Sequence, residues 1–487
     1  MTIRLLAGDI HLTDLHTRMP FRYGIATMTR SPHAFVRMHV EVEGGVSVGV
    51  AADLLPPKWF TKDPARGIDD EVEEMLRVIE HAVVAATGLQ ADSPFDAWRA
   101  LWDIQDRWGR EQGFPPLLTH FGTSLVERAM IEAVCRKLGQ PFHVVLRENL
   151  FGIRLGEIHQ PLTEYSLLGV FPPSKPLWHI LPRHTVGLLD PLRDADIPSE
   201  ERLDDGLPQS LEACARSYRG RLFKIKVQGD LAHDRDRLHG IAAVLMEHAP
   251  KIYRFSIDGN EQFRTLGAFQ EYWCGIRADD TLHLLLSSRL LFVEQPFHRS
   301  VALDPVAVGG LKDWAERPPL IIDESDGELT SLPQALELGY DGTSYKNCKG
   351  VFKGIANACL LAHVRWKNRE RPVIMSGEDL ANIGPVALLQ DLAVCAALGI
   401  ESVERNGHHY FAGLSMFPEE VQRQILAAHP DLYHPSRDLW PTLTIEDGRL
   451  SLRSVNAAPF GVAPLVDVEQ FTPLAAWRAQ HPGERGA

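Results

Sequence analysis

The sequence lacks the paired cysteines of a disulfide framework or of a structural zinc site. Its six cysteines are spread along 487 residues, and no two of them form a Cys-x-x-Cys pair. Some lie in apolar helical runs such as Ala133-Val134-Cys135, where cysteine usually serves as a small core residue. We therefore expect reduced thiols and a cytoplasmic protein.

Long apolar runs and a surplus of basic residues are also missing. No uninterrupted apolar stretch reaches the length of a membrane span, and the N-terminus has no extended apolar core before Asp9. We therefore expect neither a membrane segment nor a signal peptide. The 50 Lys and Arg residues stand against 64 Asp and Glu residues, a formal net charge of −14. This balance argues against nucleic acid, whose phosphates favour a basic surface.

The chain is long enough for more than one domain, and its first part carries both β and α signals. Residues 34–42 and 46–50 alternate between apolar and polar types on either side of Glu43-Gly44-Gly45, which predicts a hairpin. Three helical stretches follow, at roughly 69–87, 95–112 and 122–138.

From about residue 178 onward, apolar strand-like runs alternate with helical stretches. The eight strand candidates are His184–Leu189, Leu222–Val227, Tyr253–Ile257, Leu291–Val293, Leu320–Ile322, Gly342–Tyr345, Val373–Met375 and Ile400–Val403. Eight strands with helices between them predict an α/β fold of the (β/α)8 type, a TIM barrel or a close relative. Residues 151–178 are expected to be a linker with an insertion, and residues 191–208 an exposed acidic loop.

Three acidic phrases follow consecutive strand candidates of the predicted barrel. Asp258, Glu294 and Asp323 each come directly after a short apolar run, so parallel strands would present them at one rim. Three carboxylates without a cation would repel one another, whereas a hard divalent cation such as Mg²⁺ prefers oxygen ligands. The spacing therefore predicts a magnesium site.

Lysines flank these carboxylates along the barrel. Lys224 and Lys226 share one face of the second strand, and Lys346 ends the sixth strand, which lies opposite in a ring of eight. Neighbouring cations are expected to lower the pKa of a lysine toward neutrality, as a general base requires. A carboxylate substrate held by Mg²⁺ has an acidified α-proton, which one lysine could remove while the other acts on the opposite face.

Each motif also has a simpler interpretation when taken alone. A Lys-x-Lys strand is usually a solvated edge, and a lone Asp after an apolar run is more often a helix cap or turn residue. Asp323-Glu324-Ser325 could simply begin a helix. The order and spacing of the whole set favour the metal and lysine site.

Together these residues resemble the enolase superfamily, and within it the muconate lactonizing enzyme subgroup. The matching motifs are Lys224-Ile225-Lys226, Asp258-Gly259-Asn260, Glu294-Gln295-Pro296, Asp323-Glu324-Ser325, and Lys346 with Lys349. The resemblance covers most of the chain. It implies that Asp258, Glu294 and Asp323 are the Mg²⁺ ligands. It also implies that Lys226 and Lys346 are the catalytic acid/base pair, with Lys224 as a catalytic auxiliary.

The resemblance further implies how the chain is divided. Residues 1–150 would form an α+β capping domain with lid loops near 19–30 and 52–62. Residues 151–430 would form the catalytic (β/α)8-type barrel, and residues 431–487 a C-terminal segment packing back on the cap. Arg22, Tyr23, Thr27, Lys58, Trp59 and Phe60 are candidates in the lid loops, although the Trp59-Phe60 pair is also typical of a core.

The candidate substrate-binding residues are Arg22, Tyr23, Asn260, Lys349 and His408. Other features separate this chain from two related groups. The strand-seven phrase Val373 to Asp379 has no histidine, unlike that of mandelate racemases, and the phrase Glu404 to His409 lacks the paired aspartates of dipeptide epimerases.

The leading hypothesis is a Mg²⁺-dependent enzyme that abstracts the proton α to a carboxylate, giving a metal-stabilised enediolate. A racemase, epimerase or cycloisomerase of a small carboxylic acid is favoured. Alternatives are a sugar-acid dehydratase, for which His408 and His409 could supply an acid, an elimination like that of o-succinylbenzoate synthase, and a catalytically silent barrel that only binds. The expected partner is the small carboxylic acid substrate. The sequence leaves open whether copies of the chain assemble into a homo-oligomer.

Overall fold

The N-terminal part of the chain is an antiparallel sheet covered by helices. The computed structural model describes residues 1–171 and 175–481. The long strands β1 (Ile3–Tyr23), β2 (Ala26–Val42) and β3 (Gly45–Leu54) form a meander. The short strand β4 (Gln90–Ala91) pairs with β1. The predicted hairpin is present, since Val42 pairs with Gly45 across the β2–β3 turn.

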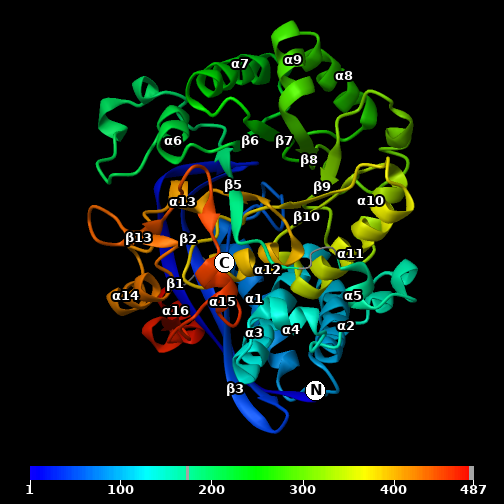
Figure 1. The fold of residues 1–487 in the computed structure, drawn as a ribbon, viewed down its shortest axis with the longest axis vertical. Coiled ribbons are helices and arrows are strands. Elements are labelled where there is room, and N and C mark those ends of the chain that lie inside the picture. Colours follow the sequence, from blue (N-terminus) through cyan, green and yellow to red (C-terminus); the bar gives the residue numbers. More distant parts are fainter. Residues whose placement is uncertain (172–174, 482–487) are drawn as a thin grey trace.

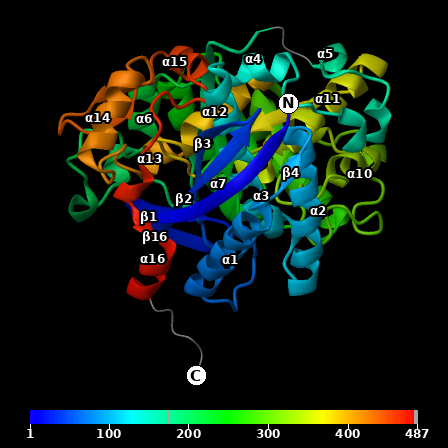
Figure 2. The ribbon, with the colours of Figure 1, turned by 90° about the horizontal axis from the view of Figure 1, so that it is seen from below.

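Three helices of this part match the three predicted stretches. They are α1 (Ile68–Ala86), α2 (Pro94–Gln112) and α3 (Pro116–Leu138), of which α3 begins six residues before its predicted start. The short helix α4 (Phe142–Arg147) was not predicted. Helix α3 is almost entirely buried because it lies between the sheet and the rest of the molecule (Figure 2). It packs closely on β3, since a Cβ on Gly49 would lie 2.0 Å from the carbonyl oxygen of Ala129.

The central part of the chain is a closed eight-stranded parallel barrel, which confirms the predicted fold class (Figure 1). Its strands are β5 (His179–Val186), β6 (Leu222–Lys226), β7 (Arg254–Asp258), β8 (Leu290–Glu294), β9 (Leu320–Ile322), β10 (Gly342–Tyr345), β11 (Ile374–Gly377) and β12 (Ser402–Arg405). Each strand pairs with the next, and β12 pairs with β5, which closes the ring. The first strand begins five residues before its predicted start, and the fifth and sixth strands coincide with theirs.

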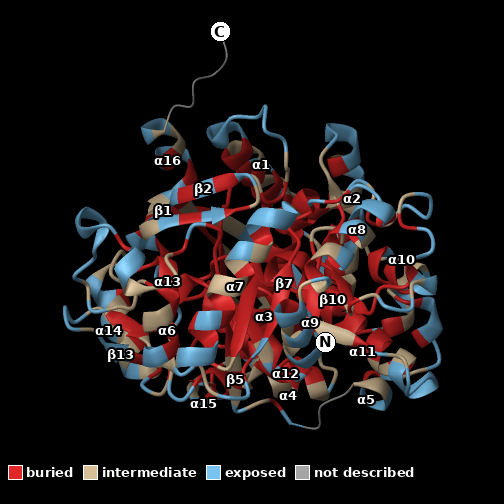
Figure 3. Cartoon of the chain, turned by 90° about the horizontal axis from the view of Figure 1, so that it is seen from above, coloured by how far each residue is buried: buried red, intermediate tan, exposed pale blue. Residues whose placement is uncertain are grey.

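Helices on the outside of the barrel cover the strands, whose own residues are buried (Figure 3). They are α6 (Leu211–Tyr218), α7 (Leu231–His248), α8 (Leu266–Arg277), α9 (Asp280–Arg289), α10 (Ser331–Leu338), α11 (Val351–Lys367) and α12 (Ala387–Leu398). The connection from β7 to β8 carries two helices, α8 and α9. The short segment α5 (Leu167–Val170) lies in the stretch expected to be a linker.

The C-terminal residues contact both parts of the molecule. After β12 come α13 (Gly407–Tyr410), α14 (Glu419–Ala428), β13 (Tyr433–Pro435), β14 (Pro441–Leu443), β15 (Leu450–Ser451), α15 (Arg453–Ala457), β16 (Thr472–Pro473) and α16 (Leu474–Gln480). Strand β15 pairs with β5 of the barrel, whereas β16 pairs with β1 of the N-terminal sheet.

Among the residues that the structure describes, no helix is long and apolar enough to cross a membrane.

Candidate active site

The carboxyl ends of the barrel strands bring the predicted site residues to one rim. Lys226 at the end of β6 pairs in register with Asp258 at the end of β7, which in turn pairs with Glu294 at the end of β8. Asp323 and Lys346 directly follow β9 and β10. All five side chains are buried. Parallel strands of similar length place their ends at one level, which explains why distant residues meet here.

Lys224 lies at the centre of a ring of carboxylates. Its Nζ is 3.2 Å from Asp258 Oδ2 and 2.8 Å from Glu294 Oε2. It also donates hydrogen bonds to Glu378 Oε2 at 2.9 Å and Glu404 Oε2 at 3.0 Å. Burial alone would lower the pKa of Lys224, but the carboxylates outweigh burial and the pKa lies well above its ordinary value.

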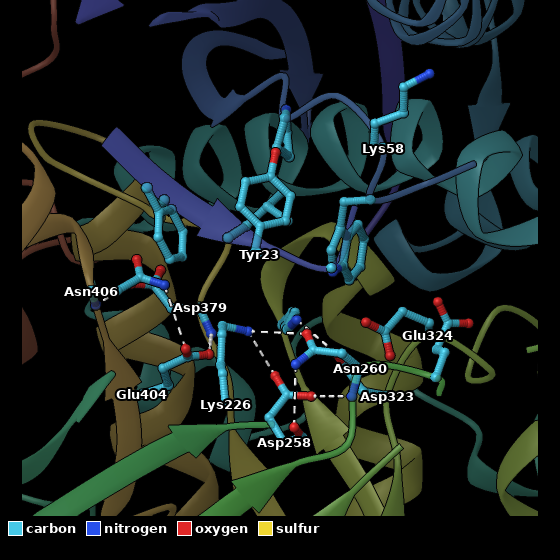
Figure 4. A pocket seen from close by; sticks show the side chains of 18 of the residues that line it. Tyr23, Lys58, Lys226, Asp258, Asn260, Asp323, Glu324, Asp379, Glu404 and Asn406 are labelled. Carbon is cyan, nitrogen blue, oxygen red and sulfur yellow. Dashed lines mark hydrogen bonds and ion pairs between the residues drawn. The ribbon is translucent and has the colours of Figure 1, made fainter. Parts of the chain in front are cut away.

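The two lysines expected to act on substrate each pair with a carboxylate. Lys226 Nζ donates to Asp258 Oδ2 at 2.8 Å (Figure 4). Lys346 Nζ donates to Asp323 Oδ2 at 2.7 Å. Burial lowers the pKa of Lys346, but the carboxylates of Asp323, Glu294 and Glu324 together raise it by more, so the net shift is upward. The lowered lysine pKa expected from the sequence is therefore not found for Lys224 or Lys346, because carboxylates rather than ammonium groups are their nearest charges.

The three predicted metal ligands form a donor set that fits a hard dication. All three offer carboxylate oxygens from adjacent strands and are almost fully buried. Among the described residues, Glu294 Oε2 accepts no well-aligned hydrogen bond, although Lys224 Nζ lies 2.8 Å away. Burial raises the pKa of Glu294 well above its usual range, as does repulsion by Glu378. A cation here would relieve that cost, because it favours the charged form.

Two carboxylates of this ring were not predicted from the sequence to be site residues. Glu378 follows β11 and Glu404 lies on β12, and both contact Lys224. Arg183 on β5 pairs with Glu378, and neither side chain is exposed. The signal was available, since Glu404 directly follows the apolar Val403 in the same way that Glu294 follows Val293. Five of the eight barrel strands thus carry a carboxylate at or directly after their carboxyl ends. These carboxylates surround the rim, whereas the three predicted from the sequence would occupy only one part of it.

A pocket lies over this rim and is covered by the N-terminal sheet. Apolar side chains supplied by the cap form its roof, among them Phe21, Tyr23, Met28 and Trp59. Lys346 Nζ lies 4.5 Å from the centre of the Trp59 ring, a cation–π contact across the pocket. Asn260, a predicted substrate contact, also lines the pocket.

Charged residues beside the pocket attach the cap loop to the barrel. Arg299 pairs with Glu261 at 2.8 Å and donates to the carbonyl oxygens of Trp59 and Phe60, each at 2.8 Å. Lys62 pairs with Glu261 at 3.5 Å. Arg299 and Lys62 are thus already paired with protein groups. The side of the pocket formed by the cap is mainly apolar, and the side formed by the barrel rim is charged.

Three of the predicted substrate contacts, Arg22, Lys349 and His408, are not among the residues that line this pocket. Arg22 is exposed because alternate residues of a strand face opposite sides and its neighbours Phe21 and Tyr23 point inward. Lys349 donates to Asp323 Oδ1 at 2.8 Å and positions that carboxylate. His408 packs between the rings of His184 and Tyr218, with centroid distances of 5.7 and 5.2 Å.

Some of the cap residues considered for the lid also differ from expectation. Thr27 is exposed, and Phe60 packs on Phe121 with a centroid distance of 4.5 Å. Lys58 is among the lining residues, but its Nζ points away and lies 3.2 Å from Glu71 (Figure 4).

A closed (β/α)8 barrel with an α+β cap over its carboxyl rim is the architecture of the enolase superfamily, and this chain has that fold. One similar structure is an enolase from Bradyrhizobium complexed with magnesium and mandelic acid, with 14% identity, 99% of this chain and 98% of that chain covered, and a TM-score of 0.58. Another is the N-succinyl Arg/Lys racemase from Bacillus cereus, with 15% identity, coverage of 96% and 98%, and a TM-score of 0.57.

A third similar structure is the 2-chloromuconate cycloisomerase from Rhodococcus opacus. It is 15% identical, covers 96% of this chain and 98% of its own, and has a TM-score of 0.59. At this level of identity the likeness shows the fold alone. No family model matches the sequence, and no curated protein matches it either.

Proposed function

We propose that this protein is a Mg²⁺-dependent enzyme that removes the proton α to the carboxylate of a small acid, most simply as a racemase, epimerase or cycloisomerase. The observation that carries the proposal is the placement of Lys226 and Lys346. They come from the second and sixth strands of the barrel and flank buried carboxylates beneath a covered pocket. The similar racemase and cycloisomerase support the same class of reaction.

Asp258, Glu294 and Asp323 would hold the metal ion. Bound there, Mg²⁺ would acidify the α-proton of a coordinated substrate, because it stabilises the negative charge that proton removal creates. Lys224 shares Asp258 and Glu294 in this structure, so its ammonium group competes with a metal for these oxygens. Among the similar structures, one dipeptide epimerase was also solved with Mg and a dipeptide.

Lys226 and Lys346 would carry the proton transfer at their Nζ atoms. Each is an ammonium group paired with a carboxylate here, so one of them must first lose its proton to act as a base. Occupation of Asp258 and Asp323 by another cation would weaken these pairings and favour that loss. One Nζ would then take the α-proton, and the other would return a proton to the opposite face.

The pocket favours an acid with an apolar part over a polyol. Phe21, Met28 and Leu380 line it beside Trp59, and they would exclude water from the reacting carbon. The sugar-acid dehydratase alternative depended on His408 and His409 as acids at a leaving hydroxyl. Neither histidine lines the pocket, so the observation that favoured that alternative is gone.

The test is exchange of the α-proton for deuterium in D₂O with Mg²⁺, read by mass spectrometry over a panel of N-acyl amino acids, aromatic hydroxy acids, dipeptides and lactones. We expect exchange of at least one acid, lost on chelation of the metal and lowered at least about a hundredfold in Lys226→Ala and Lys346→Ala. Lys251→Ala, which removes an exposed lysine, is the matched control.

Undiminished exchange in both lysine variants would contradict the assignment of these residues as acid and base. Absence of exchange across the whole panel would instead support the catalytically silent barrel.

A further inference from the structure

A second cluster of metal-ligating side chains lies outside the pocket. His184 is on β5, Cys214 on α6 and His409 on α13, which follows β12. All three are buried, and one ligand atom from each lies within 4.8 Å of the other two. None of them lines the pocket over the carboxylate ring. The three elements meet where the first and last barrel strands pair.

One pair in this cluster, Cys214 and His409, has the separation of two ligands on one zinc ion. Cys214 Sγ lies 3.6 Å from His409 Nδ1. With Zn–S near 2.3 Å and Zn–N near 2.05 Å in a tetrahedron, sulfur and nitrogen ligands lie about 3.6 Å apart. The other ligand atoms of the set lie within 4.8 Å of one another, so binding of one ion would require the imidazole rings to turn toward it.

An unpartnered nitrogen points to a missing ligand. His184 is 6% exposed, and among the described residues its Nδ1 makes no hydrogen bond. A buried polar atom without a partner is costly, so such atoms usually have a partner not yet seen, such as an ion. Burial lowers the pKa of His184 to about 4, so the ring is neutral and able to coordinate.

The carboxylate of Asp190 lies next to the cluster, where it can orient the ring of His409. His409 turns Nδ1 toward Cys214 and Nε2 toward Asp190, whose Oδ2 is 3.9 Å away. Tyr410 and the backbone of Gly187 hold Asp190, at 2.6 and 2.7 Å. Histidines that bind metals usually direct their second nitrogen to such a carboxylate, which orients the ring.

We propose that His184, Cys214 and His409 bind one Zn²⁺ ion in a structural site, with water or a neighbouring group as the fourth ligand. On binding, the Cys214 thiol loses its proton to solvent and the thiolate joins the metal. The ion would join β5, α6 and α13 at the seam of the barrel. The proposal is independent of the magnesium site, whose ligands are all oxygens.

The test uses the full-length protein, loaded with Zn²⁺ or Co²⁺ in excess Mg²⁺ and then dialysed. We expect one zinc per chain by elemental analysis, and with Co²⁺ a near-ultraviolet charge-transfer band from the thiolate. Both should be lost in Cys214→Ser and kept in Cys274→Ser, which changes an exposed cysteine. Asp323→Asn should also keep both, which separates this site from the carboxylate ring.

Circular dichroism of each variant checks that it is folded, and the cobalt band of the unaltered protein decides the matter even if Cys214→Ser does not fold. No retained metal and no thiolate band would overturn the proposal and leave a metal-free packing of a thiol against two imidazoles. Equal zinc content in the unaltered protein and in folded Cys214→Ser would overturn it as well.

Discussion

At the scale of the residue, the site depends on how one ammonium group is shared. Lys224 contacts Asp258, Glu294, Glu378 and Glu404, and it is 2% exposed. Lys226 also pairs with Asp258 and Arg183 with Glu378, but Lys224 is the cation that all four carboxylates share, and such a buried network is stable only while its cations are present. Lys224 therefore neutralises part of this ring, including two of the proposed metal ligands.

Replacing Lys224 with Met should reveal this dependence. Removing one partner of a buried ionic network leaves uncompensated charges, so we expect the unfolding free energy to fall by about 3 kcal/mol in metal-free buffer. Mg²⁺ should restore part of that loss, since it can occupy the same oxygens. Urea denaturation with and without Mg²⁺ measures both effects, with Lys251→Met as the control. An equal response of both variants to Mg²⁺ would contradict the shared site.

At the scale of the element, α3 of the cap supports the start of α11 of the barrel. Glu127 on α3 accepts hydrogen bonds from the backbone N–H groups of Val351 and Phe352, at 3.0 and 2.7 Å. A carboxylate is favourable at the N-terminus of a helix, because it satisfies free N–H groups and faces the positive end of the helix dipole. Helix α11 begins five residues after Lys346, so this contact helps to position Lys346, one of the two lysines proposed to transfer the proton.

The ionisation of Glu127 predicts a pH dependence of stability. Burial raises its pKa from 4.5 to about 7, although the backbone hydrogen bonds oppose the shift. The native state then binds more protons than the unfolded state between these values, so the unfolding free energy falls as pH rises from about 4.5 to 7. Glu127→Gln should remove up to about 3 kcal/mol of that fall.

Chemical denaturation at several pH values measures this difference. Glu111→Gln, which changes an exposed residue of α2, is the control and should follow the unaltered protein. Parallel curves for Glu127→Gln and the unaltered protein would show that Glu127 is ionised throughout this range.

At the scale of the whole molecule, the pocket exists because two parts of the chain close on each other. The cap supplies the roof and the barrel supplies the charged floor. Arg299 joins them, since it is held by Glu261 of the barrel and donates to the backbone of Trp59 and Phe60 in the cap loop. A guanidinium group can make these contacts at once because its donors are held in a rigid plane.

Arg299→Met should therefore loosen the cap loop without unfolding the barrel. We expect faster amide hydrogen exchange in residues 56–67 and a higher KM for the substrate identified by the exchange assay, since the roof would close less often. Hydrogen exchange read by mass spectrometry localises the change. Arg423→Met, on an exposed surface, is the control. Unchanged exchange in the loop would show that other contacts hold it.

Much of this molecule could be inferred from residue order. Strand and helix periods are local properties, so the hairpin, the three cap helices and the eight barrel strands were predicted near their observed places. The rim residues were also predicted, because a residue that directly follows a parallel strand must lie at its carboxyl end. Asp258, Glu294, Asp323, Lys226 and Lys346 gather there for that reason.

Other properties of the residues discussed above depend on neighbours that are distant in the chain, so only the tertiary structure determines them. The upward shift in the pKa of Lys346 results from Asp323 at the end of the neighbouring strand, together with Glu294 and Glu324. His408 packs against His184 because the first and last strands of the barrel, β5 and β12, pair with each other. Cys214 and His409 are 195 residues apart in sequence, and they meet only because the ring of strands closes.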